Sequence, residues 1–98
     1  MRKVKTEKKP RKVLTGTRAY NRLARLVGNN IRNGREYIGY TRRDMGQARE
    51  FKHLYTPEKC IYQWEKGLAL PFVYNLCCIV RFFRARGYDI SFDELLGE

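Results

Sequence analysis

The sequence has few cysteines and no long apolar run, and each shortage excludes a class of protein. Cys60, Cys77 and Cys78 are odd in number and lack the paired CxxC spacing of a zinc site, so reduced, packed thiols are expected. No stretch approaches the roughly eighteen apolar residues of a membrane span, and the basic beginning lacks the apolar segment of a signal peptide. We therefore expect a soluble, cytoplasmic protein that makes no membrane contact.

The residues needed for catalysis are equally scarce. His53 is the single histidine and has no Asp, Glu or Cys at metal-ligand spacing, so we interpret it as a surface or turn residue. The sequence shows no nucleophile with its base, no pair of catalytic carboxylates and no glycine-rich phosphate loop. We expect no enzyme activity, no metal, no cofactor and no small-molecule substrate.

Acidic residues are scarce in the first half of the chain, and this imbalance indicates a polyanionic partner. Residues 1–12 carry seven Lys/Arg and one Glu, residues 13–52 carry nine against three acids, and residues 53–98 carry five against six. Such a field accelerates encounter with nucleic acid and displaces its counterions. The alternatives are a merely solvated surface and an anionic membrane, which would need an amphipathic helix with exposed bulky apolar residues.

The chain divides into a disordered basic arm over residues 1–16 and one domain over residues 17–98. The first twelve residues repel one another and contain the helix breaker Pro10. In the arm, the cations that could wrap a duplex or enter a groove are Lys8, Lys9, Arg11 and Lys12. A solubilising tail is the alternative.

Helical periodicity predicts the first part of the domain. Apolar residues recur three, four and seven apart over residues 17–38, with arginines between them. Thr41 is a good N-cap for a second helix over residues 42–52. Thr56, followed by a proline at the first helical position, caps a third helix over residues 57–66.

The rest of the domain also reads as helical. A fourth helix begins at Pro71 and ends before Gly87, and Ser91 with Glu94 forms a capping box that begins a fifth. No internal repeat and no convincing strand alternation occurs. The sequence therefore predicts an all-α chain.

Three segments carry a resemblance to a known family: IRNGREYIGYTRRDMG (31–46), TPEKCIYQWEKGLALP (56–71) and ISFDELLGE (90–98). They resemble the Cro and phage-repressor (XRE-like) helix-turn-helix family. The most specific part is the Trp-Glu-x-Gly-x-x-x-Pro signature that closes the third helix. The resemblance implies a compact five-helix bundle of the lambda-repressor-like type.

Three features depart from the family pattern. Gly46 stands where the family prefers Ala, and Arg42 stands where many members carry a Gln that contacts DNA. The distance from Met45 to Ile61 is longer than in the compact motif by about five residues. Either the second helix continues through Lys52, or FKHLY (51–55) is an inserted loop.

The resemblance also implies a salt bridge inside the domain. Family members join an arginine of the first helix to the glutamate that ends the third, and Arg35 and Glu65 occupy these positions. Physical chemistry agrees, because a carboxylate near a helix C-terminus meets the negative end of the macrodipole and needs a cation nearby. We predict that Arg35 and Glu65 form a salt bridge that supports the scaffold.

With Cys60, Ile61 and Trp64 directed to the core, the third helix presents its polar side to base edges in the major groove. The candidates for base readout are Glu58, Lys59, Tyr62 and Gln63. The candidates for contact with the DNA backbone are Thr41, Arg42, Arg43, Thr56 and Lys66. An ordinary polar helix face is the alternative.

These observations together predict a sequence-specific transcriptional regulator, a repressor of the phage or mobile-element kind, that binds a double-stranded DNA operator as a homodimer. The apolar face of residues 71–83 and the segment DELLGE (93–98) are the candidate dimer surface, with a fully satisfied core as the alternative. A second hypothesis is an antitoxin-like or adaptor protein that uses the fold mainly to bind another protein. Recognition of structured RNA is a third and weaker one.

Overall fold

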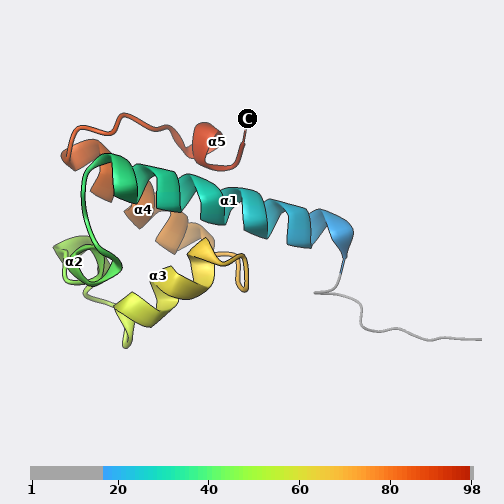
Figure 1. Ribbon diagram of the computed structural model, residues 1–98, viewed down its shortest axis with the longest axis horizontal. Coiled ribbons are helices and arrows are strands. Elements are labelled where there is room, and N and C mark those ends of the chain that lie inside the picture. Colours follow the sequence, from blue (N-terminus) through green and yellow to red (C-terminus); the bar gives the residue numbers. More distant parts are fainter. Residues whose placement is uncertain (1–16, 98) are drawn as a thin grey trace, which may run out of the picture.

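Five α-helices and one short 3₁₀-helix make up the part of the chain that the computed structural model describes, residues 17–97, and this part contains no β-strand. The elements are α1 (Arg18–Tyr37), α2 (Arg42–Gly46), η3 (Arg49–Phe51), α3 (Pro57–Glu65), α4 (Val73–Ala85) and α5 (Phe92–Leu95). α1 crosses the molecule in front of α4, with α2 and α3 below it and α5 above it (Figure 1). The expected compact, all-helical fold is confirmed. The arm expected over residues 1–16, with Lys8, Lys9, Arg11 and Lys12, lies outside the described residues.

α1 is the amphipathic helix that the apolar spacing predicts. The hydroxyl oxygen of Thr17 accepts a hydrogen bond from the backbone N–H of Tyr20 at 3.1 Å and so caps the first turn. Val27 and Ile31 are fully buried on the inner side. Gly39 follows the helix with a φ of 78°, a left-handed conformation that glycine adopts without steric penalty. Neither α1 nor any other helix between residues 17 and 97 combines the length and the apolar character required to cross a membrane.

α1 and α3 touch backbone to backbone at Gly28. A Cβ atom on Gly28 would lie 2.2 Å from the carbonyl oxygen of Trp64 and 3.0 Å from that of Glu65. The first distance is shorter than real Cβ atoms show and the second is unusually tight, so a side chain here would push the helices apart and glycine allows them to approach this closely. This contact sets the position of the C-terminal end of α3.

The segment after α2 differs from both sequence-based alternatives. α2 ends at Gly46 instead of continuing through Lys52, the backbone is extended at Ala48, and η3 follows. Met45 and Phe51 are both fully buried. In one continuous helix these two residues would point about 120° apart around the axis. The break at Ala48 lets both side chains reach the same core.

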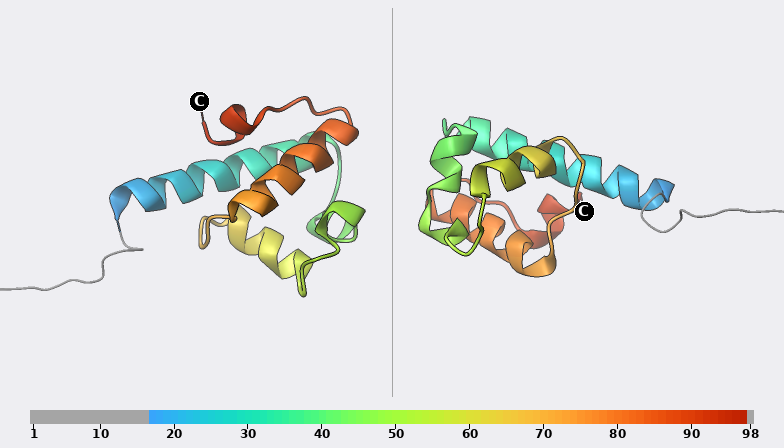
Figure 2. Two further views of the ribbon diagram at one scale, coloured as in Figure 1. Left: turned by 180° about the vertical axis from the view of Figure 1, so that it is seen from behind. Right: turned by 90° about the horizontal axis from the view of Figure 1, so that it is seen from below.

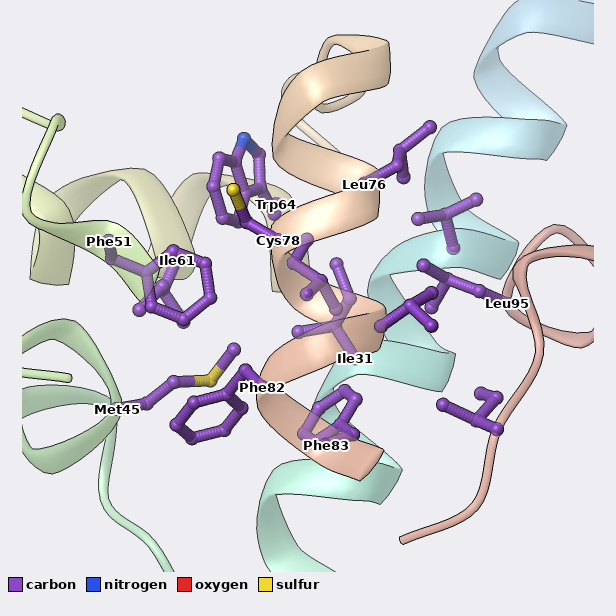
Figure 3. Close-up of a cluster of buried hydrophobic side chains, with 14 residues drawn as sticks. Ile31, Met45, Phe51, Ile61, Trp64, Leu76, Cys78, Phe82, Phe83 and Leu95 are labelled. Carbon is purple, nitrogen blue, oxygen red and sulfur yellow. The ribbon is translucent and has the colours of Figure 1, made fainter. Parts of the chain in front are cut away.

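α4 turns its apolar side into that core (Figure 3). Phe82 and Phe83 are fully buried, and the Phe82 ring lies 5.5 Å from the ring of Phe51. The helix begins at Val73, two residues later than expected, because the backbone is still extended at the N-cap residue Phe72. Most of the apolar face that suggested a dimer surface is therefore used inside one chain.

α5 closes the other side of α1. The Ser91 hydroxyl oxygen accepts a hydrogen bond from the Glu94 N–H at 3.0 Å, and the Ser91 N–H donates to the Glu94 carboxylate at 2.9 Å, which confirms the predicted capping box. The side-chain amide of Asn30 in α1 donates to the carbonyl oxygens of Glu94 and Leu95 at 3.3 and 3.0 Å. Leu95 is fully buried.

Replacing Gly28 by Ala should destabilise the domain, because the new methyl group has to push α3 away from α1. We expect the free energy of unfolding to fall by about 2 to 4 kcal/mol in a urea titration followed by circular dichroism. Asn29→Ala, at the neighbouring exposed position, is the matched control and should change this free energy by less than about 0.5 kcal/mol. Small effects in both variants would contradict the close helix contact.

Candidate nucleic-acid interface

α2 begins with a complete capping box at Thr41. The Thr41 hydroxyl oxygen accepts a hydrogen bond from the Asp44 N–H at 3.0 Å, and the Thr41 N–H donates to the Asp44 carboxylate at 3.5 Å. The N-cap position predicted for Thr41 is therefore confirmed. The cap holds Arg42 and Arg43 in the first turn of α2.

α3 begins without the expected cap. Pro57 occupies its first position, as predicted, but the Thr56 side chain makes no capping hydrogen bond. The Thr56 backbone has φ −129° and ψ 75°, outside the extended conformation that brings an N-cap side chain to the helix N–H groups. Thr56 is exposed, so its hydroxyl is accessible at the surface.

α2 approaches the beginning of α3 closely at Gly46. A Cβ atom on Gly46 would lie 3.1 Å from the backbone nitrogen of Glu58 and 3.3 Å from the Cβ atom of Pro57. The alanine that the family prefers here would need its neighbours to shift slightly. The glycine therefore belongs to a tight contact between the two helices.

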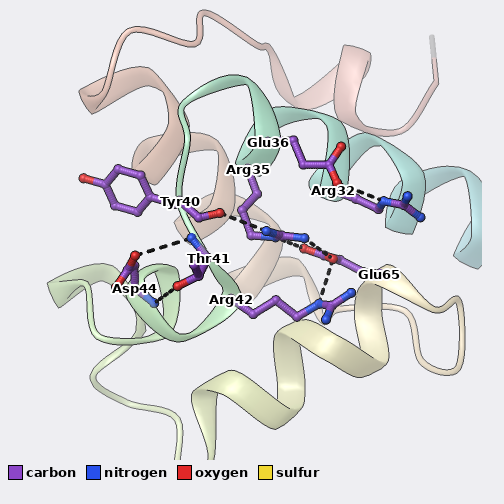
Figure 4. A network of polar contacts seen from close by, with 8 residues as sticks. All are labelled: Arg32, Arg35, Glu36, Tyr40, Thr41, Arg42, Asp44 and Glu65. Atoms are coloured by element: carbon purple, nitrogen blue, oxygen red, sulfur yellow. Dashed lines mark hydrogen bonds and ion pairs between the residues drawn. The ribbon is translucent and has the colours of Figure 1, made fainter.

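Glu65, at the end of α3, is buried and binds two arginines (Figure 4). Arg35 of α1 donates from Nε to one carboxylate oxygen at 2.6 Å and from Nη2 to the other at 3.0 Å, while its Nη1 donates to the Tyr40 carbonyl at 2.8 Å. Arg42 of α2 donates from Nε to Glu65 at 3.0 Å. The predicted pairing of Arg35 with Glu65 is thus present, and its hydrogen bonds raise the pKa of Arg35 more than burial lowers it.

This shared carboxylate joins three helices at one point. The Glu65 side chain is only 1% exposed, so water hardly screens its interaction with the two guanidinium groups. Two cations also compensate the unfavourable position of a carboxylate at a helix C-terminus. Nothing in the sequence predicts the contact of Arg42, because no spacing rule links residues 42 and 65.

Arg42 extends the network to the outer side of α3. Its guanidinium carbon lies 5.2 Å from the centre of the Tyr62 ring, and Nζ of Lys66 lies 5.7 Å from the same centre. Both distances allow cation–π attraction. Three of the predicted contact residues therefore form one cluster.

α3 has the two-sided character that its sequence predicts. Ile61 and Trp64 are buried, and Cys60 is half-buried. The exposed positions on the opposite side are Glu58, Lys59, Tyr62 and Lys66. Gln63 is half-buried, so it is less accessible than the prediction requires.

An open groove of about 570 Å³ lies between α2 and α3. Six predicted contact residues line it: Arg42, Arg43, Thr56, Glu58, Lys59 and Tyr62. Thr41, Gln63 and Lys66 are not among the lining residues. Gln47 also lines the groove, one helical turn after Arg43, and this spacing of four could have identified it. The lining has three cations and one acid, so its net charge is positive.

His53 and the cysteines lie outside this groove. His53 is exposed, as expected, and its Nε2 lies 2.6 Å from Oδ1 of Asn75. Cys60, Cys77 and Cys78 are free thiols. Residues 17–97 contain no group of three or more His, Cys, Asp or Glu side chains arranged to hold a metal ion.

Comparisons of the chain with protein-family models, with curated proteins and with solved structures found no match. The resemblance to the Cro and phage-repressor family stays a prediction. The positions of the helices and the contacts of Glu65 stand independently of it.

Replacing Glu65 by Gln should destabilise the domain, because Arg35, whose side chain is 11% exposed, then loses its compensating charge. We expect the free energy of unfolding to fall by about 3 to 5 kcal/mol in a urea titration. Glu58→Gln removes an exposed acid from the same helix and should change this free energy by less than about 0.5 kcal/mol. Equal effects of the two substitutions would show that the buried network does not support the fold.

Proposed function

We propose that the chain is a sequence-specific DNA-binding regulator that inserts α3 into the major groove of a duplex. The buried Glu65 network carries this proposal, because it braces α3 from behind while the opposite side of the helix stays exposed. α3 has nine residues and is therefore about 14 Å long. The major groove of B-DNA, about 12 Å wide, accepts a helix of this kind.

The exposed side of α3 supplies the base contacts. Lys59 can donate to guanine, Glu58 can accept from cytosine, and Tyr62 can offer its hydroxyl or the edge of its ring. Gln63 can pair with adenine, although its half-buried position makes this contact depend on closer docking. These four residues are proposed to select the operator sequence.

The cations beside α3 supply the phosphate contacts. Arg42 uses Nε for Glu65, while its terminal amino groups have no hydrogen bond among the described residues and its side chain is 33% exposed. It can therefore bind a phosphate without releasing the buried carboxylate. Arg43 and Thr56 line the same groove. Thr41, whose hydroxyl can contact a phosphate, directly precedes the lining residue Arg42, and Lys66 follows the lining residue Tyr62 by four positions.

The proposal includes two copies on one operator. A single short helix reads only a few base pairs, and two-fold pairing doubles the contact. The arm, with its cations, is proposed to add phosphate contacts around the duplex. A role as a repressor of the phage or mobile-element kind rests on the family resemblance alone.

DNA titrations at several salt concentrations test the proposal as a whole. Binding to a random duplex should weaken steeply as salt rises, because each phosphate contact releases counterions. Arg43→Ala should weaken binding to all duplexes alike and reduce the slope of log affinity against log salt by about one. Arg22→Ala removes the same charge from the exposed side of α1 and should leave the slope unchanged. The absence of salt-dependent binding to any duplex would reject the proposal.

Selection of bound sequences from a random duplex pool tests the role of α3. Gln63→Ala should relax the preference at one base pair of the selected site, with a loss of about 1 to 3 kcal/mol on that site. Asn33→Ala also removes a side-chain amide, from an exposed position of α1 outside the groove, and should leave the preference intact. If Gln63→Ala weakens all sequences equally, this residue makes no base contact.

A further inference from the structure

A second groove lies between η3 and α4. It has a volume of about 690 Å³ and shares no lining residue with the α2–α3 groove. α4 faces the viewer when the molecule is seen from behind (Figure 2, left), whereas α1 passes in front of it in Figure 1. The proposed DNA contact gives no role to the side chains of this second groove.

Positive charge dominates the walls of the second groove. Its four exposed cations are Arg49, Lys52, Arg81 and Arg84. The one carboxylate in the lining, Glu50, accepts hydrogen bonds from both terminal nitrogens of Arg86 at 3.3 Å, so its charge is already compensated. Asp89 approaches Arg84 to 3.6 Å, but both side chains are largely exposed and the pair is weak.

We refer to the apolar side chains that line the second groove, Tyr74, Val80 and Ala85, as its floor. Val80 is almost completely buried, and Ala85 is exposed. The Tyr74 ring stands edge-on to His53, with 5.0 Å between the ring centres. The hydrogen bond between His53 and Asn75 fixes this arrangement.

Apolar surface continues beyond the groove at the beginning of α4. Phe72 is 82% exposed and Val73 is 69% exposed. Both directly precede Tyr74 in the chain. The outer side of α4 is therefore apolar in its first half and basic in its second half, where Arg81 and Arg84 lie.

Three kinds of occupant fit this surface poorly. In a two-fold contact with a second copy, the four cations of one groove would face those of the other. A duplex would use the cations but leave the apolar floor without a partner. A membrane surface could meet the exposed Phe72 and Val73, but a flat bilayer would not fill a groove that charged walls border.

We propose that the second groove binds an acidic amphipathic helix of a partner protein. Apolar side chains spaced three and four apart on such a helix would lie on the floor against Tyr74 and Val80. Its carboxylates would pair with Arg49 and Lys52 on one wall and with the arginines of α4 on the other. This proposal does not rest on DNA binding, because the two grooves share no residue.

Selection from a random library of displayed peptides tests this proposal. Peptides of about 16 residues form roughly four helical turns, enough to span the groove. Enriched peptides should be acidic, with apolar residues at helical spacing, and calorimetry should show that the double variant Arg81→Ala/Arg84→Ala weakens their binding by about tenfold or more. Ala85→Glu, which adds a negative charge to the floor, should weaken it similarly.

The matched control is Arg18→Ala/Arg22→Ala, which removes two exposed arginines from α1 and should weaken peptide binding by less than about twofold. Enrichment without acidic bias, or equal weakening by both double variants, would overturn the proposal. So would displacement of the peptides by duplex DNA, or concentration-dependent dimers that Arg81→Ala/Arg84→Ala abolishes. If the unaltered chain binds the peptides but binds no duplex DNA, the proposed function is rejected and the proposal for the second groove stands.

Discussion

The buried carboxylate of Glu65 is the interaction on which the arrangement of α1, α2 and α3 depends. Removing a charge from water is costly, and here three hydrogen bonds from two guanidinium groups offset that cost. Gly28, where a Cβ atom would clash with the backbone of α3, and Gly46, where it would fit only tightly, let the helix backbones approach closely. A single ionic centre thus fixes the direction in which the polar side of α3 faces.

A second, smaller network of an arginine and a carboxylate lies at η3. Arg86 binds the Glu50 carboxylate, donates to the Phe82 carbonyl at 2.9 Å and lies 4.0 Å above the Phe82 ring. Burial alone would raise the pKa of Glu50, but the backbone hydrogen bond and Arg86 together lower it. Each groove therefore lies beside an acid whose charge is neutralised by arginines from other parts of the chain: Glu65 is buried, and the Glu50 side chain is 10% exposed. These ion pairs hold the short elements α2 and η3 in addition to their own backbone hydrogen bonds.

Local rules predict much of this fold. The caps at Thr41 and Ser91, the position of Pro57 and the apolar spacing of α1 are properties of a few neighbouring residues, and each is found as expected. The prediction that Arg35 pairs with Glu65 rested on the family resemblance together with the helix dipole.

Tertiary packing decides the remaining features. The end of α2 depends on the need to bury Phe51, which lies against Phe82 far along the chain. From the sequence alone, the wide apolar face of α4 fits either a buried core or a dimer surface. The positions of the neighbouring helices are needed to decide between the two. For the candidate site, the sequence predicts the exposed positions of α3, whereas the contact of Arg42 with Glu65 and the half-buried state of Gln63 follow from three-dimensional arrangement.

The single tryptophan of the sequence, Trp64, is 5% exposed and directly precedes Glu65. Its indole ring lies 6.4 Å from the ring of Phe51, so both α3 and the segment after α2 contribute to its surroundings. Its intrinsic fluorescence is therefore sensitive to the surroundings of the buried side of α3. Any event that shifts this helix away from the core changes the polarity around the indole and becomes visible without a label.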